Sequence, residues 1–331
     1  MIIIYRPVMR NGIPTDSLES HVLPPDMPIP SDALWIDLLY PEKSEEKLVE
    51  KSLNIEIPTR EEMADIEPSE ILYWENNARY MTARVLCHTE MDSQRLIDVS
   101  FILAESALVT VRYDEPKSFS MFIARIAKPG GCKPLAEAVL DGLIEIIIDR
   151  AADILAISGK DINALSRSIF QDEKTEEQGE SRYRKVLRLL GRKADVVSNV
   201  AESMASIERL LLFLSVNLER PQKASGFLAE WRTAIRDVQS IEEHSTFLSN
   251  KIQFLLDATL GLVNIEQNDI IKLFSVVAVV FMPPTLIASI YGMNFKVIPE
   301  LEWVWGYPLA LVLMVLAAIM PYLFFRWKGW L

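Results

Sequence analysis

Proline is nearly missing from the middle of this 331-residue chain. Between positions 135 and 282 the only proline is Pro221, so little in that region interrupts a helix. Hydrophobic residues recur there at intervals of three and four, the spacing of one helix face. We therefore predict three long helices, with breaks near residues 172–179 and 218–226 and a third helix that begins near Ser225.

Cysteine and histidine are also scarce. The chain has two cysteines, Cys87 and Cys132, and three histidines, and their spacing matches no zinc-ligand pattern. Cys87 and His88 are adjacent, but we expect them on a strand, where neighbouring side chains point to opposite faces. The sequence therefore predicts that both cysteines are reduced and structural.

A basic surface is absent as well. The formal net charge of −12 argues against nucleic-acid binding and against docking on anionic lipid through basic residues. It is compatible with attraction of cations and equally with ordinary solubility. Residues 1–6 lack the basic start and long apolar stretch of a signal peptide, so we expect the N-terminal part to stay in the cytoplasm.

Charge is missing altogether from residues 273–291 and 307–325, two stretches of nineteen residues each. A helix of about 20 apolar residues crosses the hydrocarbon core of a bilayer. Lys272, Arg326 and Lys328 flank the stretches on one side, which predicts that both termini are cytoplasmic. Two spans cannot surround a polar path through lipid, so transport would require several subunits around one axis.

Residues 1–133 alternate short apolar stretches with helical ones, bounded by Pro, Asn, Asp and Gly. The pattern predicts a mixed α/β domain with a hairpin turn at Asn76 and Asn77. The predicted strands are 2–6, 34–39, 71–75, 80–87, 97–103 and 108–112, and the predicted helices are 43–53, 60–63 and 118–127.

A short motif, Gly292-Met293-Asn294, ends the first uncharged stretch. Residues 298–301, Ile-Pro-Glu-Leu, follow it, and Gly306-Tyr307-Pro308 opens the second stretch. In these features the sequence resembles the CorA magnesium transporters, the two-transmembrane GxN family. Residues 68–70 and 80–83 are similar to the soluble domain of that family, so the resemblance covers nearly the whole chain.

The resemblance implies a funnel-shaped homopentameric channel in the inner (plasma) membrane, with the first span lining the pore. Intracellular Mg²⁺ bound between subunits would favour the closed state. The expected parts are a cytosolic α/β domain (1–133), paired cytosolic helices (134–222), a stalk helix (223–271), a first membrane helix (272–295), a periplasmic loop (296–305), a second membrane helix (306–326) and a basic tail (327–331).

One face of the predicted first span carries a stripe that is polar at its outer end, apolar in the middle and polar again below. Its members are Ser289, Thr285, Met282, Ala278, Phe274, Ile271 and Asn268, followed in the stalk by Asp257, Asn250 and Glu243. Such small and polar residues could instead only allow close helix packing. The resemblance implies a selectivity filter at Gly292, Met293 and Asn294, a hydrophobic gate at Met282 and a funnel carboxylate at Asp257.

Mg²⁺ gives up its water reluctantly, so a filter need not dehydrate it. A ring of Asn294 carbonyl groups could hydrogen-bond to the coordinated waters, whereas carboxylates would bind many divalent ions directly. The sequence shows no ATP-binding motif, and we expect no organic cofactor. A membrane potential supplies about 2.3 kcal/mol per charge per 100 mV, which is enough to drive uptake.

The regulatory metal site is the least defined part. The resemblance places the usual interface aspartate nearest to Thr233, so we assign the site to carboxylates nearby. They are Asp237, Glu242 and Glu243, facing Glu90 or Asp92 of a neighbouring subunit. Each could equally be an ordinary solvated charge.

Two other readings stay open. The cargo could be Co²⁺ or Ni²⁺, or the chain could belong to the related ZntB branch, which handles Zn²⁺. In a different class, the chain could be a cytosolic sensor or enzyme that the two spans only anchor. Against an enzyme, the α/β part has no phosphate loop, nucleophile elbow or clustered catalytic pair.

Overall fold

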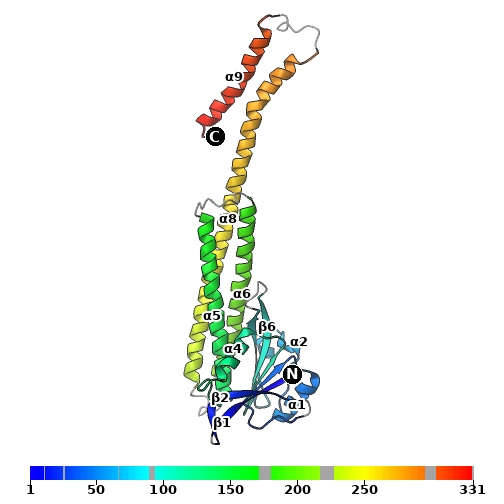
Figure 1. Ribbon diagram of the computed structural model, residues 1–331, viewed down its shortest axis with the longest axis vertical. Helices are drawn as coiled ribbons and strands as arrows, with labels where there is room; N and C mark the ends of the chain where they lie inside the picture. Colours follow the sequence, from blue (N-terminus) through cyan, green and yellow to red (C-terminus); the bar gives the residue numbers. More distant parts are fainter. Residues whose placement is uncertain are drawn as a thin grey trace. The chain divides into compact units, whose positions relative to one another are not determined.

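A computed structural model describes residues 1–10, 12–24, 27–65, 67–88, 94–170, 180–216, 227–294 and 303–329 (Figure 1). The chain divides into two compact units. The first contains Met1–Glu173 and Arg188–Leu255, and the second contains Lys174–Leu187 and Leu256–Leu331.

The first unit contains a sheet of seven strands in the order β2-β1-β3-β7-β6-β5-β4. Its central pair, β3 and β7, is parallel, and the other pairs are antiparallel. The strands are β1 Ile2–Arg10, β2 Ile13–Val22, β3 Trp35–Leu39, β4 Leu72–Glu75, β5 Ala78–Cys87, β6 Arg95–Leu103 and β7 Leu108–Arg112.

All six predicted strands are present, but the sequence analysis missed β2 and the short helix α3 (Pro68–Ile71). Of the ten residues of β2 only Leu18 is buried, so this edge strand lacks the alternation that marks a half-buried strand. The predicted hairpin turn is confirmed. Asn76 and Asn77 both have positive φ (48° and 61°), as a tight two-residue turn requires.

Helices cover both faces of the sheet. On one face, Ile36 and Leu38 of β3 share a core with Val49 of α1 (Lys43–Leu53) and Met63 of α2 (Arg60–Met63). On the other face, Trp35 packs its ring edge against Phe122 of α4 (Lys117–Ile126), with ring centroids 5.6 Å apart. All five residues of β3 are therefore buried, as expected for a central strand covered on both sides.

The described part of the chain after α4 contains four long helices: α5 (Ala136–Phe170), α6 (Glu180–Val216), α8 (Leu228–Tyr291) and α9 (Gly306–Trp327). The two predicted breaks, 172–179 and 218–226, lie outside the described residues. α8 continues without interruption from the predicted stalk into the first apolar stretch, and its 64 residues correspond to about 96 Å of helix.

Candidate ion pathway and metal-ligating clusters

Among the residues that the structure describes, two helices are long and apolar enough to cross a membrane. They are α8, in its outer part, and α9, and their most apolar windows have mean hydropathies of 2.2 and 2.3. In the single chain, most large apolar side chains of these two helices are exposed. Exposed apolar surface of this extent would be unstable in water, so the second unit has the surface of a membrane domain.

The members of the predicted stripe are exposed, as are most other residues in the outer part of α8. Phe274 is 70% exposed and Met282 is 66% exposed, whereas Val276 is 4% exposed. Two residues correspond to a rotation of about 200°, so Val276 points away from Phe274 and Ala278. The other stripe members, Asn268, Ile271, Thr285 and Ser289, are exposed too, and so are Asp257, Asn250 and Glu243 further down the helix.

The helix passes through Pro283 and Pro284 without a break. Each proline lacks the N–H that would bond to the carbonyl four residues earlier, so Val279 and Val280 lose their usual helical donors. The Thr285 hydroxyl donates to the Phe281 carbonyl at 2.7 Å.

The Gly292-Met293-Asn294 motif follows directly on the last residue of α8. The Gly292 N–H donates to the Ala288 carbonyl at 3.0 Å, and the Met293 N–H donates to the Ile290 carbonyl at 3.3 Å. A Cβ atom at position 292 would lie 3.1 Å from the Ala288 oxygen, a tight approach that glycine avoids. Asn294 comes next and is exposed, with its side chain beyond the end of the helix.

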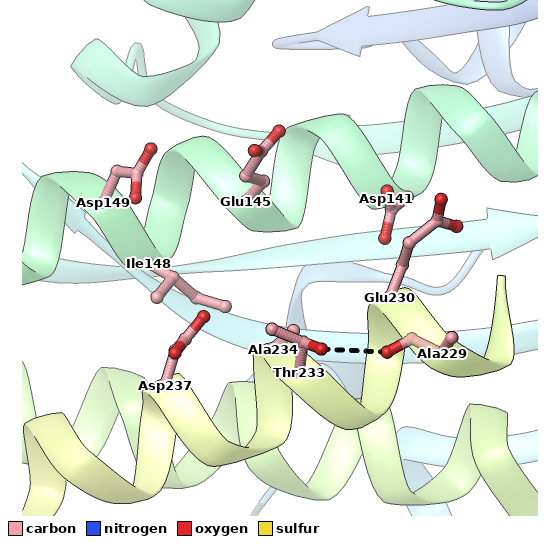
Figure 2. A pocket seen from close by; sticks show the side chains of 9 residues that line it. All are labelled: Asp141, Glu145, Ile148, Asp149, Ala229, Glu230, Thr233, Ala234 and Asp237. Atoms are coloured by element: carbon pink, nitrogen blue, oxygen red, sulfur yellow. Dashed lines mark hydrogen bonds between the residues drawn. The ribbon is translucent and has the colours of Figure 1, made fainter.

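An acidic groove lies between α5 and α8 in the first unit (Figure 2). It has a volume of about 460 Å³, and Ile148, Ala229, Thr233 and Ala234 form its uncharged lining. Its carboxylates are Asp141, Glu145 and Asp149 of α5 and Glu230 and Asp237 of α8.

The groove carries strong repulsion between like charges. Burial and the negative charges of Glu230 and Glu145 raise the pKa of Asp141 to about 6. Burial and neighbouring carboxylates, including Asp237, also raise the pKa of Asp149. Glu145 has a partial counterion, because Arg125 Nη1 lies 2.6 Å from its Oε2. A bound cation would relieve this repulsion.

The structure separates the predicted regulatory carboxylates. Asp237 lies in the acidic groove, and so does Thr233. Glu242 is half-buried outside the groove, where burial and the charge of Glu208 raise its pKa, and Glu243 is exposed. Glu90 and Asp92 lie outside the described residues.

The sequence analysis missed the α5 half of the groove, although its signal was present. Asp141, Glu145 and Asp149 recur every four residues, the spacing that places side chains on one helix face.

Cys87 and Cys132 are both free and buried, as expected, but a second cluster corrects the expected orientation of Cys87 and His88. Possible ligand atoms of Cys87, His88 and Asp114 all lie within 4.8 Å of one another. Opposite orientations were expected for Cys87 and His88, but β5 ends at Cys87 and His88 has a φ of +53°. Side chains alternate between the two faces only within an extended strand. His88 lies beyond the strand in a left-handed conformation, so its side chain need not point away from that of Cys87. Burial and the charge of Asp114 raise the pKa of the Cys87 thiol to about 11.

Comparison with protein families matches residues 30–327 to the family described as CorA-like Mg²⁺ transporter protein. The magnesium transport protein CorA of Pasteurella multocida is 35% identical over 301 residues, which cover 91% of this chain and 93% of the relative.

Solved structures have the same fold. The complete CorA magnesium transporter of Methanocaldococcus jannaschii matches with a TM-score of 0.76 and 18% identity, covering 100% of this chain and 99% of that one. The cytoplasmic domain of ZntB from Vibrio parahaemolyticus matches with a TM-score of 0.57 and 11% identity, covering 77% and 95%. These likenesses confirm the predicted fold class of an α/β domain, long helices and two C-terminal apolar helices.

Proposed function

We propose, because the chain belongs to the CorA-like Mg²⁺ transporter family, that it carries Mg²⁺ across the inner membrane into the cell. The observation that carries this proposal is the extent of the match, which spans both apolar helices and the residues between them. The members of this family are transporters, which confirms the expectation that the chain is not an enzyme. The alternative of a membrane-anchored enzyme is therefore not supported.

The proposed transporter is a homopentamer with both termini in the cytoplasm. Two apolar helices per chain are too few to enclose a polar path, which supports assembly of several copies. The exposed stripe of α8 would then face the central axis, and the inside-negative potential would drive the ion inward.

Five Asn294 side chains would form the outer filter. They follow the final turn of α8, where Gly292 keeps that turn tight. Amide carbonyls accept hydrogen bonds from the waters of hydrated Mg²⁺ without binding the ion so strongly that it cannot leave. Met293 completes the motif, and its 49% exposed side chain would help to shape the entrance.

Further along the stripe, Ile271, Phe274 and Met282 would form apolar rings. An ion that keeps its hydration shell cannot pass a narrow apolar ring from which water is expelled. Opening then requires the α8 helices of neighbouring subunits to move apart. Ala278, Thr285 and Ser289 are smaller and would line wider parts of the path, while Asn268 would form a polar ring at the inner end.

Inside the cell, Mg²⁺ would close the channel by binding to carboxylates at subunit contacts. Asp237 is the best supported member of this site, because it is exposed and lies among four other groove carboxylates. Glu242, Glu243, Glu90 and Asp92 are the other proposed members, and Asp257, Asn250 and Glu243 would attract cations along the funnel. Bound Mg²⁺ would shift the equilibrium between the open and closed channel only to the extent that it binds the closed state more tightly than the open state.

Liposome flux tests the proposal directly. Purified protein should admit Mg²⁺ into liposomes when the interior is made negative, and internal Mg²⁺ should slow that flux. Competition by Co²⁺, Ni²⁺ and Zn²⁺ distinguishes the cargoes, because a ZntB-like protein would admit Zn²⁺ in preference. Absence of Mg²⁺ flux from pentameric, folded protein would refute magnesium transport.

A further inference from the structure

We propose that Cys87, His88 and Asp114 bind a transition-metal ion of borderline softness, with Zn²⁺ as the best match. The site belongs to the α/β sheet and uses none of the residues assigned to the ion path or to feedback by Mg²⁺. It therefore stands or falls independently of the proposed transport of Mg²⁺.

The distances are close to those of a metal centre. The ligand atoms lie within 4.8 Å of one another, and His88 Nε2 is 3.9 Å from Asp114 Oδ1. Around tetrahedral Zn²⁺, such atoms would be separated by roughly 3.3–3.6 Å. Side-chain rotations that move the ligand atoms by about an ångström would therefore bring them to metal-binding distances without any movement of the strands.

The backbone brings the adjacent residues Cys87 and His88 together with Asp114, which comes from another part of the sequence. Cys87 is the last residue of β5 and pairs with Arg95 of β6, and Asp114 lies two residues after β7. His88 follows Cys87 with a φ of +53°, a backbone conformation that histidine adopts infrequently. This turn is the reason that the imidazole lies beside the thiol, and an unusual conformation at such a point suggests a function.

The carboxylate is held in place by surrounding groups. The Glu115 N–H donates to Asp114 Oδ1 at 2.8 Å, and Arg112 Nη1 donates to the Asp114 backbone carbonyl at 2.7 Å. Arg95 pairs with the other oxygen, Oδ2, and Oδ1 lies 3.9 Å from His88 Nε2. Supporting contacts of this kind orient ligands in metal centres.

The set of donor atoms selects the class of metal. One sulfur, one nitrogen and one oxygen suit Zn²⁺ or Co²⁺, whereas Mg²⁺ prefers oxygen ligands and keeps its waters. When the metal–sulfur bond forms, the thiol proton passes to solvent, because the thiolate is the ligand. Cys87 is fully buried and the His88 side chain is 35% exposed, so the ion would enter from the histidine side. Water would occupy the fourth position.

Cobalt provides the test. Full-length protein in detergent is treated with chelator, and Co²⁺ is then added in the presence of excess Mg²⁺, which fills sites made of oxygen ligands. We expect the near-ultraviolet charge-transfer band of a Co²⁺–thiolate bond, saturating at one ion per chain and lost when Zn²⁺ is added. Absence of the band from the parent protein would overturn the proposal.

Two variants and one control assign the ligands. Cys87→Ser should abolish the band, whereas Cys132→Ser should keep it, since Cys132 is also a buried free cysteine but has no such ligand group in the described chain. His88→Gly should weaken Co²⁺ binding at least tenfold, because the imidazole ligand is lost. The variant should still fold normally, because glycine readily adopts a φ of +53°. A band that survives in Cys87→Ser, or unchanged affinity in folded His88→Gly, would show that these residues are not ligands.

Discussion

Asp37 and Arg112 form a buried ion pair across the parallel strands β3 and β7, with Nη2 of the arginine 2.8 Å from Oδ2 of the aspartate. The Arg112 Nε atom also donates to both carboxylate oxygens, and Thr110 donates to Oδ1. The guanidinium lies over the ring of Phe119, 4.8 Å from its centroid. These contacts satisfy both charges inside the core, where an unpaired charge would be very costly.

Removal of one partner should therefore destabilise the α/β domain. We expect Arg112→Met to lower the free energy of unfolding by about 3–5 kcal/mol, since it leaves the Asp37 carboxylate buried and unpaired. The double variant Asp37→Leu/Arg112→Met should recover most of the loss. Denaturant titration followed by circular dichroism measures both, and equal destabilisation of the single and double variants would contradict this explanation.

Asn294→Ala should reduce Mg²⁺ flux in liposomes by at least about tenfold. The variant loses hydrogen bonds to the hydrated ion, and a hydrogen bond to a charged species contributes about 1.5–3 kcal/mol. Asn294 is exposed, so its loss should not affect folding or oligomer size. Asp269→Asn is the comparison, because it changes an exposed polar side chain of α8 that lies two residues, or about 200° of rotation, from Ile271 of the stripe. Near-normal, selective flux through Asn294→Ala would remove the residue from the filter.

Met282→Gly should increase Mg²⁺ flux when internal Mg²⁺ is high, because a wider apolar ring admits water more readily. Leu273→Gly serves as the comparison: this residue is also exposed (56%) but points about 180° away from Met282. If Met282 faces lipid, both variants should change only the thermal stability. Flux measured at several internal Mg²⁺ concentrations separates these outcomes.

Asp237→Lys combined with Glu243→Lys should weaken the inhibition of flux by internal Mg²⁺, since a carboxylate site for the cation would be lost. The concentration of internal Mg²⁺ needed to halve the flux should rise severalfold. Flux at low internal Mg²⁺ should still be measurable, which distinguishes loss of feedback from loss of the pore. An unchanged inhibition curve would assign feedback to other residues.

The acidic groove should make stability depend on pH. The pKa of Asp141 is raised to about 6 in the folded protein from an ordinary value of 3.8, so folding favours its neutral form. This contribution to stability is complete below about pH 4 and is lost as the pH rises through 6.

We therefore expect Asp141→Asn to melt a few degrees higher than the parent at pH 7.5 and at nearly the same temperature at pH 4. Asp195→Asn removes one exposed carboxylate of α6 outside the groove and should show no such pH dependence. A difference that is constant across this pH range would contradict the raised pKa.

The sequence predicted the features that depend on periodicity and on long stretches of one kind of residue. The central strands, the hairpin at Asn76 and Asn77 and the apolar helices all have such local signals. β2 was missed because its stability comes from pairing with β1 rather than from burial of its own side chains. The groove and the Cys87–His88–Asp114 cluster were missed because they join residues far apart in the sequence or depend on one left-handed residue.

The continuity of α8 from Leu228 to Tyr291 limits how its length can vary in evolution. Deletion of one residue between Asp237 and Asn294 would turn everything beyond it by about 100° and shift it by about 1.5 Å along the axis. Residues beyond the deletion would then no longer share a helix face with the residues before it. Natural variation in this segment should therefore replace residues freely but insert or delete them only in sets, such as seven or eleven, that restore the helical phase.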